Sequence, residues 1–472
     1  MTSLSDKIWL SLAWLAQWLV RLLSFTFRSA TLLGFLLFII AAAFYGYAQT
    51  EHGRAFFKEK IQTIFSELFN GRLAFHQVTI AFPNEIAIDS IRLYVGVDTL
   101  PSLSLNKLTL ELDADVLYDG VLKGFGDRIH LRRIALSHPV LQLMEDSTGR
   151  FTLLQLIKSD TTTTQDTLAT ALPKLIFNEI AIDNAHITWY RFAGQSAVPD
   201  SLKYDKWEFA HASLQAYFEY QNDIFTFILR ALHFDLPTKH FTLESASGFL
   251  SLNSERVELI GWRVQTRESM LACHASLSGL NLFAPITKEA IEKTRFALEL
   301  DVPRAVPKEF QPFVPDTPLP EGEFSTLILA RGWLNNFTLS PSYLQTPKSQ
   351  IHLSGEVVGI ATLENLWVNL LLRPSQLSIP ELYELFGIEG LKDYRNLGTV
   401  EVEGTYRGTR DNFKADAALH SIAGTLRANL ELSFRQGLPI TYIGGIETEH
   451  LNLGLALGDS SLWSNINFNR RS

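Results

Sequence analysis

A repeated alternation of apolar and other residues, starting near residue 72, most constrains how this chain can fold. Four segments follow one pattern, in which two apolar-any-apolar triplets are separated by two spacer residues. Alternate apolar positions are typical of a β-strand with one wet face, and the spacer changes the phase as a bulge or corner would. The copies hold Ile86, Ile88, Ile91 and Leu93; Leu103, Leu105, Leu108 and Leu110; Ile129, Leu131, Ile134 and Leu136; and Ile180, Ile182, Ala185 and Ile187.

Further repeats point to the same fold class. The hexapeptide Asn-Glu-Ile-Ala-Ile-Asp occurs at Asn84–Asp89 and again at Asn178–Asp183. Longer strands are predicted at Phe241–Leu252, Arg256–Thr266 and Ser269–Leu277, bounded by polar turns as in an all-β array. Internal repeats outrank other signals for fold class. The sequence therefore predicts a mainly β protein made of stacked strand–turn–strand units.

A second repeat predicts tight turns, and few helices interrupt the strands. Gly332–Phe337, Gly359 with Glu364–Leu366, and Gly408–Phe413 each join a glycine to an acidic or amide residue, Asn and an apolar residue. Gly and Asn supply the positive φ that hairpin turns need. Helices are predicted at Thr287–Thr294 and at Ile379–Phe386, the second with Pro380 in its first turn.

The N-terminal region predicts a membrane anchor. Residues 29–48 contain no charge, and twenty helical residues span roughly 30 Å, the thickness of a bilayer's hydrocarbon core. The alternative is a cleaved signal peptide, with Ala41–Ala43 as the cleavage site. Residues 1–28 are predicted to form an interfacial amphipathic segment on the cytoplasmic side, or else a helix packed against a partner's anchor. An amphipathic helix at 53–70 is expected to cap the array.

The rest of the chain divides by composition. Repeats are expected over 72–306 and 323–472, joined by the proline-rich connection 307–322, which no central strand would tolerate. Because the last residues read as part of a strand, the second array is expected to be truncated at its C-terminus.

No motif indicates chemistry. The sequence has no H-E-x-x-H, G-x-x-x-x-G-K-[ST] or G-x-S-x-G pattern, and no enzyme, cofactor or metal site is predicted. Cys273 and His274 are adjacent, so on a strand they face opposite sides. The net charge of −9 and the lack of a basic stripe argue against nucleic-acid binding.

The apolar face is open to two interpretations. Alternate apolar residues usually pack one sheet on another. A quasi-one-dimensional array has no opposite sheet unless it folds over on itself, and a curled sheet with an apolar lining would hold acyl chains. Periodicity alone does not decide between these interpretations.

Three blocks resemble a known family. They are the anchor and helix followed by Leu73–Val95; Ile129–Ile157, where a strand pair ending in PVLQL precedes a Leu-rich helix; and Leu397–Asn467, with its Gly-Thr and Asn-Phe turns. Together they are similar to the TamB and AsmA-like envelope proteins of Gram-negative bacteria, specifically the N-terminal portion of the long TamB type.

The resemblance implies a function. It implies an elongated, curled antiparallel β-groove in the periplasm, with a single-pass inner-membrane anchor and a cytoplasmic N-terminus. Phospholipids would move between the inner and outer membranes along the groove, and an outer-membrane β-barrel of the TamA or BamA type would be the partner. The lining candidates are the apolar positions of the four copies, with Ala185 left out. A scaffold for outer-membrane protein assembly, which would extend the exposed strand edge, and a passive envelope tether are the alternatives.

Overall fold

The computed structural model describes most of the chain from residue 58 onward. Residues 1–57, with the predicted segment 1–28 and the predicted anchor 29–48, lie outside the described residues. Within those residues, no helix is both long enough and apolar enough to cross a bilayer. The structure describes residues 58–59, 62–63, 65–66, 69–81, 84–95, 100–113, 128–146, 151–156, 174–195, 202–281, 287–314, 319–360, 366–387, 389–434, 441–458 and 466–471.

The chain forms two compact units, Met1–Asn253 and Ser254–Ser472, called unit 1 and unit 2. Both are mainly β, with antiparallel pairing dominant and few helices, so the predicted fold class is confirmed at this level. The division falls at residue 253, whereas the proline pattern predicts a connection at 307–322. That segment lies inside unit 2, between two strands that pair with each other.

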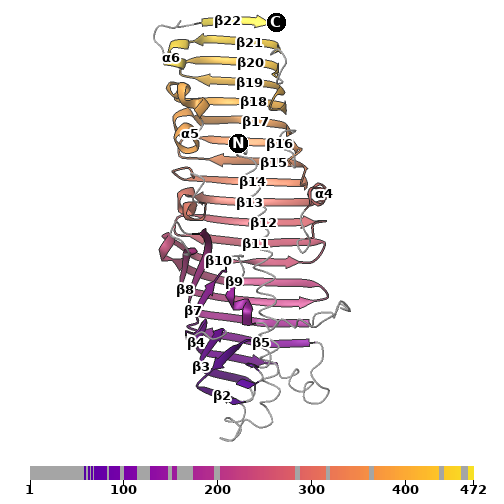
Figure 1. The fold of residues 1–472 in the computed structure, drawn as a ribbon. Coiled ribbons are helices and arrows are strands. Elements are labelled where there is room, and N and C mark those ends of the chain that lie inside the picture. Colours follow the sequence, from indigo (N-terminus) through magenta and orange to yellow (C-terminus); the bar gives the residue numbers. More distant parts are fainter. Residues whose placement is uncertain are drawn as a thin grey trace. The chain divides into compact units, whose positions relative to one another are not determined.

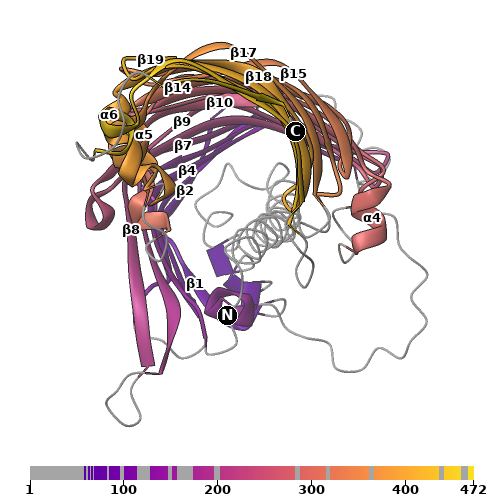
Figure 2. The same cartoon turned by 90° about the horizontal axis from the view of Figure 1, so that it is seen from above.

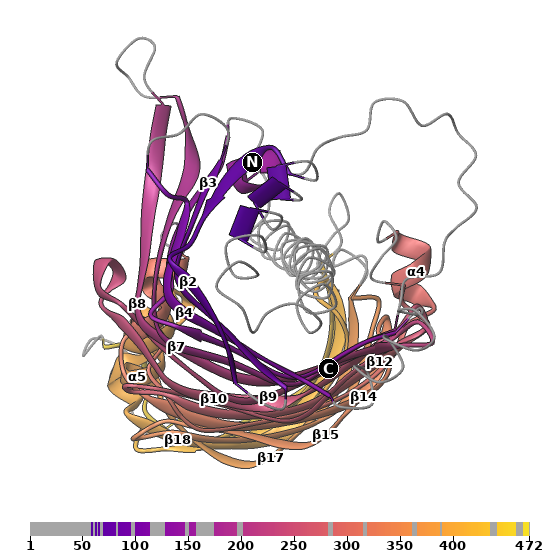
Figure 3. The ribbon, with the colours of Figure 1, turned by 90° about the horizontal axis from the view of Figure 1, so that it is seen from below.

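Unit 1 contains ten strands that the structure describes, together with two short 3₁₀ helices (Figures 1 and 3). At two places in the sheet, two consecutive short strands occupy the position of one strand. Strands β1 and β2 both pair with β3, and β5 and β6 both lie between β4 and β7. The elements are β1 (Gly71–Ala74), β2 (Gln77–Ala81), β3 (Glu85–Val95), β4 (Leu103–Leu112), β5 (Arg128–Ser137), β6 (Val140–Met144), η1 (Thr152–Leu156), β7 (Lys174–Gln195), β8 (Leu202–Gln221), β9 (Ile224–Leu236), η2 (Pro237–Lys239) and β10 (Phe241–Leu252).

One part of unit 1 departs from the antiparallel array. Strands β5 and β6 both run parallel to β7, with Ile134 opposite Ile180 and Leu141 opposite Ile187. Parallel neighbours need a crossover connection, and here the chain between β6 and β7 includes η1. The alternation of apolar residues reports which face a side chain occupies but not the direction of the neighbouring strand.

The predicted phase changes are found at the spacers of three copies. In β3 the spacer residue Ser90 has φ +54°, and in β7 the spacer residue Asn184 has φ +50° beside a register shift. In β5 the register against β4 shifts between Leu131 and Arg133. These irregularities keep the apolar positions on one face through the change of phase.

Unit 2 is a meander in which β11 to β22 pair in sequence order, each antiparallel to the next (Figure 1). Its elements are β11 (Arg256–Thr266), β12 (Met270–Ser278), α4 (Lys288–Glu292), β13 (Arg295–Ala305), η3 (Pro307–Phe313), β14 (Phe324–Trp333), β15 (Asn336–Gln345), β16 (Gln350–Val358), β17 (Trp367–Ser378), α5 (Ile379–Phe386), η5 (Glu389–Leu397), β18 (Thr399–Thr409), β19 (Asn412–Ser421), β20 (Gly424–Ser433), β21 (Thr441–Leu451), α6 (Leu453–Leu457) and β22 (Ile466–Arg471).

In unit 2 the structure confirms two predicted hairpin turns and one predicted helix. The turn repeats at Gly332–Phe337 and Gly408–Phe413 close two-residue hairpins, with Trp333 opposite Asn336 and Thr409 opposite Asn412. The helix predicted at Ile379–Phe386 has those bounds, with proline in its first turn.

The strands of unit 2 are arched (Figure 2). Glycine permits sharp local bending, because Gly332 and Gly408 have φ +146° and +143° and a Cβ on either would lie within 3 Å of the neighbouring strand's backbone. An aromatic residue covers each one, since Phe337 lies opposite Gly332 and Phe413 opposite Gly408. The rings of Phe296 and Phe337 meet edge to face, with centroids 5.2 Å apart.

Candidate ligand-binding face

Two rows of apolar residues cross unit 2 without a break. Each row takes one residue from every strand from β11 to β21, and each residue is the register partner of the next. No charged residue occurs in either row. Row A is Val257, Leu277, Phe296, Gly332, Phe337, Val357, Val368, Gly408, Phe413, Leu432 and Tyr442; row B is Leu259, Ala275, Leu298, Ala330, Leu339, Gly355, Leu370, Tyr406, Ala415, Leu430 and Gly444.

The opposite face of the same strands carries the charges. The positions between rows A and B include Arg331, Glu356 and Arg407, all exposed. Cys273 and His274 illustrate the separation, because Cys273 pairs with Leu300 and His274 with Glu299. Alternation thus divides the sheet of unit 2 into an apolar face, defined by rows A and B, and a charged face.

The apolar face of unit 2 is only partly covered. Most residues of rows A and B are half-buried, and the exceptions are Val257, Ala330 and Gly408, which are buried, and Tyr442, which is 61% exposed. Side chains in the interior of a closed core are normally buried on all sides. Rows A and B therefore form a surface that still presents apolar area.

The corresponding face of unit 1 is closed by a core. The amphipathic helix expected at 53–70 is helical at residues 58–59, 62–63 and 65–66, and its Phe65 belongs to this core. Phe69 and Leu156 of η1 also lie in the core. The Phe65 and Phe69 rings stack with centroids 4.8 Å apart. These residues cover the apolar side of the first strands.

The lining candidates from the sequence fall mainly in that core. Their proposed contact with lipid stays a prediction, but the structure gives most of them other neighbours. Buried core members are Ile86, Ile88, Ile91, Leu105, Leu108, Leu110, Leu131 and Ile134; partly buried residues packed against the core are Leu93, Leu103, Leu136 and Ile180; Ile182 and Ile187 are half-buried on β7; Ile129 lies on β5 opposite Leu175, with its side chain outside the described residues.

Rows A and B show the same alternation of apolar residues in unit 2, where no lining residues are predicted from the sequence. The alternation that places them is visible in Arg256–Thr266 and in Thr399–Thr409, where every second residue from Val400 to Gly408 is apolar or small. The alternation predicts a strand at Arg256–Thr266, whereas no strand is predicted by name at Thr399–Thr409. Choosing row residues also required the register between strands, which turn positions alone do not provide.

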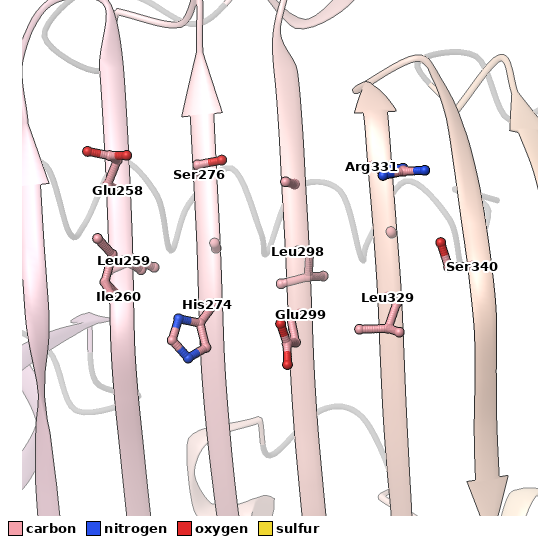
Figure 4. Close-up of a pocket in the computed structure, with 13 residues that line it drawn as sticks. Glu258, Leu259, Ile260, His274, Ser276, Leu298, Glu299, Leu329, Arg331 and Ser340 are labelled. Carbon is pink, nitrogen blue, oxygen red and sulfur yellow. The ribbon is translucent and has the colours of Figure 1, made fainter.

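A hollow of about 400 Å³ lies over β11 to β15 (Figure 4). Its lining combines residues of the charged face with the row B residues Leu259, Ala275, Leu298 and Ala330. Glu258, His274, Glu299 and Arg331 are among its lining residues. His274 accepts a hydrogen bond at Nδ1 from the Gly261 N–H at 3.2 Å, so this imidazole is engaged by the strand next to it. Within the described part of the chain, no group of three or more His, Cys, Asp and Glu residues is placed to hold a metal ion.

Comparison with known proteins adds no name: no family model, no curated protein and no solved structure matches this chain. The function is therefore argued from the two faces of the sheet.

Proposed function

We propose that the apolar face of unit 2 binds the acyl chains of phospholipids and lets them move across the strands. The observation that supports this is the continuity of rows A and B, which cross from β11 to β21 without a charge while staying half-buried. Transfer of each CH₂ from water to an apolar surface is worth about 0.8 kcal/mol. A chain sliding along an uninterrupted apolar face keeps that free energy at every step.

The proposal extends to the cellular setting through the sequence resemblance. In it, the arched sheet is an elongated groove, residues 29–48 anchor the chain in the inner membrane with the N-terminus in the cytoplasm, and the sheet stands in the periplasm. The groove carries phospholipids between the inner and outer membranes, with an outer-membrane β-barrel of the TamA or BamA type as partner.

Photocrosslinking in the full-length protein tests the binding face. A benzoylphenylalanine at position 370, in row B, should crosslink phospholipid in cells, because Leu370 is half-buried among apolar neighbours. The matched control is position 369, where Asn369 is exposed on the charged face. Mass spectrometry of the purified protein would identify the attached lipid.

Three outcomes are informative. Phospholipid attached at 370 and absent at 369 supports the proposal, and equal labelling at both positions contradicts it. Nascent outer-membrane proteins attached at 370 in place of lipid would favour the scaffold for protein assembly. If neither lipid nor protein attaches and function survives replacement of the sheet by an inert spacer, the passive tether remains.

A further inference from the structure

A hydrogen-bonded carboxylate cluster occurs twice in unit 2. In the first copy, Glu309 of η3 accepts hydrogen bonds at Oε2 from the Thr266 hydroxyl at 2.6 Å and the Ser269 hydroxyl at 2.9 Å. Its Oε1 accepts from the Glu268 N–H at 3.3 Å. Ser269 Oγ in turn accepts from the Val306 N–H at 3.0 Å, just before η3.

The second copy repeats these contacts. Glu381 of α5 accepts from the Thr346 hydroxyl, from the Ser349 hydroxyl at 2.6 Å and from the Lys348 N–H at 2.9 Å. Ser349 Oγ accepts from the Ser378 N–H at 3.0 Å. Glu381 is 7% exposed, and Thr346 and Ser349 are also buried.

The sequence carries this cluster as a short motif. Gln-Thr-x-x-Ser occurs at Gln62–Ser66, Gln265–Ser269 and Gln345–Ser349. The last two each join two paired strands, whereas residues 62–63 and 65–66 are helical. The glutamate lies three residues beyond the residue whose N–H binds the serine, in both copies. In each copy a single carboxylate therefore joins a hairpin to a helix that follows it in the chain: β11–β12 to η3, and β15–β16 to α5. We call each cluster a latch.

Both latches lie on the apolar-face side of the sheet. Thr266 continues the alternation of Trp262 and Val264, and Trp262 pairs with Cys273, which shares its face with Ala275 of row B. By the same alternation, Thr346 shares the face of Leu344, whose partner Thr326 shares the face of Ala330 in row B. Glu309 and Glu381 therefore reach the strand ends from the side of rows A and B.

The segment formed by Asn452 and α6 follows a strand as η3 and α5 do, but it has no latch. Like Val306 and Ser378, Asn452 precedes a helix and donates its N–H to the neighbouring hairpin, here to Ala423 O at 2.7 Å. The residue three positions later is Leu455, which is 38% exposed. A backbone bond thus holds α6 at the place where a carboxylate binds η3 and α5, half-buried at Glu309 and buried at Glu381.

We propose that Glu309 and Glu381 are positioning residues that fix η3 and α5 as a side wall along one margin of the ligand-binding face, an attachment that α6 lacks. The inference rests on the proposed function, because a wall matters only if rows A and B hold a ligand. A fixed wall slows the sideways escape of an acyl chain, and an opened wall speeds its exchange.

Hydrogen exchange on the full-length protein tests the latch itself. Glu381→Gln keeps the size of the side chain but replaces an acceptor by an NH₂ group, which cannot accept from the hydroxyl donors. Amides of α5 should exchange at least about tenfold faster, because hydrogen bonds to a charged acceptor are among the stronger ones in proteins. Amides in the middle of β15 to β18 should be unchanged. Glu384→Gln is the matched control, since Glu384 is exposed on the same helix.

Lipid exchange tests the wall. Protein loaded with pyrene-labelled phosphatidylethanolamine and mixed with phosphatidylethanolamine–phosphatidylglycerol vesicles should release the label several-fold faster in Glu381→Gln than in Glu384→Gln. The amount bound at saturation should be the same. If Glu381→Gln fails to fold, Thr346→Val and Thr346→Ser replace it, because only the serine variant retains the hydroxyl donor.

The outcomes separate the two proposals. Wild-type protein that takes up no labelled lipid overturns both the proposed function and the wall, even if exchange at α5 shows that the latch exists. Lipid uptake with unchanged release in Glu381→Gln overturns the wall alone. Faster hydrogen exchange throughout β15 to β18 by the same factor as in α5 also overturns it, because the glutamate would then stabilise the whole sheet.

Discussion

Truncating one leucine in each unit tests whether the apolar face is closed in unit 1 and open in unit 2. Leu110 is fully buried in the core, with Ile86 and Ile134 as register partners. Its replacement by alanine removes buried methyl groups and leaves a cavity, which should cost about 3 to 4 kcal/mol of unfolding free energy. Leu370 of row B is half-buried, so part of its surface already meets water and no enclosed cavity forms. The cost of Leu370→Ala should be about 1 kcal/mol.

The assay must report each unit separately, since a chain with two units need not unfold in one step. Urea titrations read by pulsed hydrogen exchange and mass spectrometry give one transition for peptides of β3 to β5 and another for peptides of β16 to β18. Leu371→Ala is the control, because Leu371 is 43% exposed on the charged face and should change stability by less than about 0.5 kcal/mol. If Leu370→Ala costs as much as Leu110→Ala, row B is part of a closed core, and the reasoning that leaves it available to a ligand is refuted.

Two more predictions concern the apolar face. Gly408→Ala should lower the stability of unit 2 by at least about 2 kcal/mol, because the added Cβ would lie 2.3 Å from Asn412 O at φ +143°; Gly390→Ala, with nothing within 4 Å, should be nearly neutral in the same urea titration. Burial raises the pKa of the Cys273 thiol, so less thiolate is present at a given pH and maleimide should label Cys273 more slowly in folded protein than in urea. Bound phospholipid should slow the labelling further, and labelling as fast in the folded as in the unfolded chain would contradict the placement of Cys273.

The predictions that succeeded depend on local chemistry. Phe241–Leu252 and Arg256–Thr266 have the strand bounds expected from alternation and polar turns, and α5 begins at a proline-containing first turn. The hairpin at Gly408–Phe413 follows from residues that accept unusual backbone angles. Each of these features is set by residues close together in the chain.

The features that could not be predicted depend on distant partners. Ile86 and Leu370 sit in the same kind of alternating pattern, yet Phe65 and its neighbours close a core in one unit and nothing in the pattern reveals this. The parallel pairing of β5 and β7 likewise needs the path of a crossover. The latches are a different case. Gln-Thr-x-x-Ser is visible in the sequence at both of them, but it also occurs at Gln62–Ser66, and its meaning depends on Glu309 and Glu381, which lie far along the chain from it.

The sequential meander of unit 2 has a consequence for how such a protein can change in length. Each interior strand that the structure describes in unit 2 bonds to the strands before and after it. Its contacts are therefore with its nearest neighbours, as in other linear arrays. The two latches occur at equivalent hairpins four strands apart, β11–β12 and β15–β16. A module of four strands could be duplicated or lost as a block while the remaining strands kept their partners, changing the reach of the sheet in steps of about 19 Å. The length of such a sheet could then change without redesign of the individual strands.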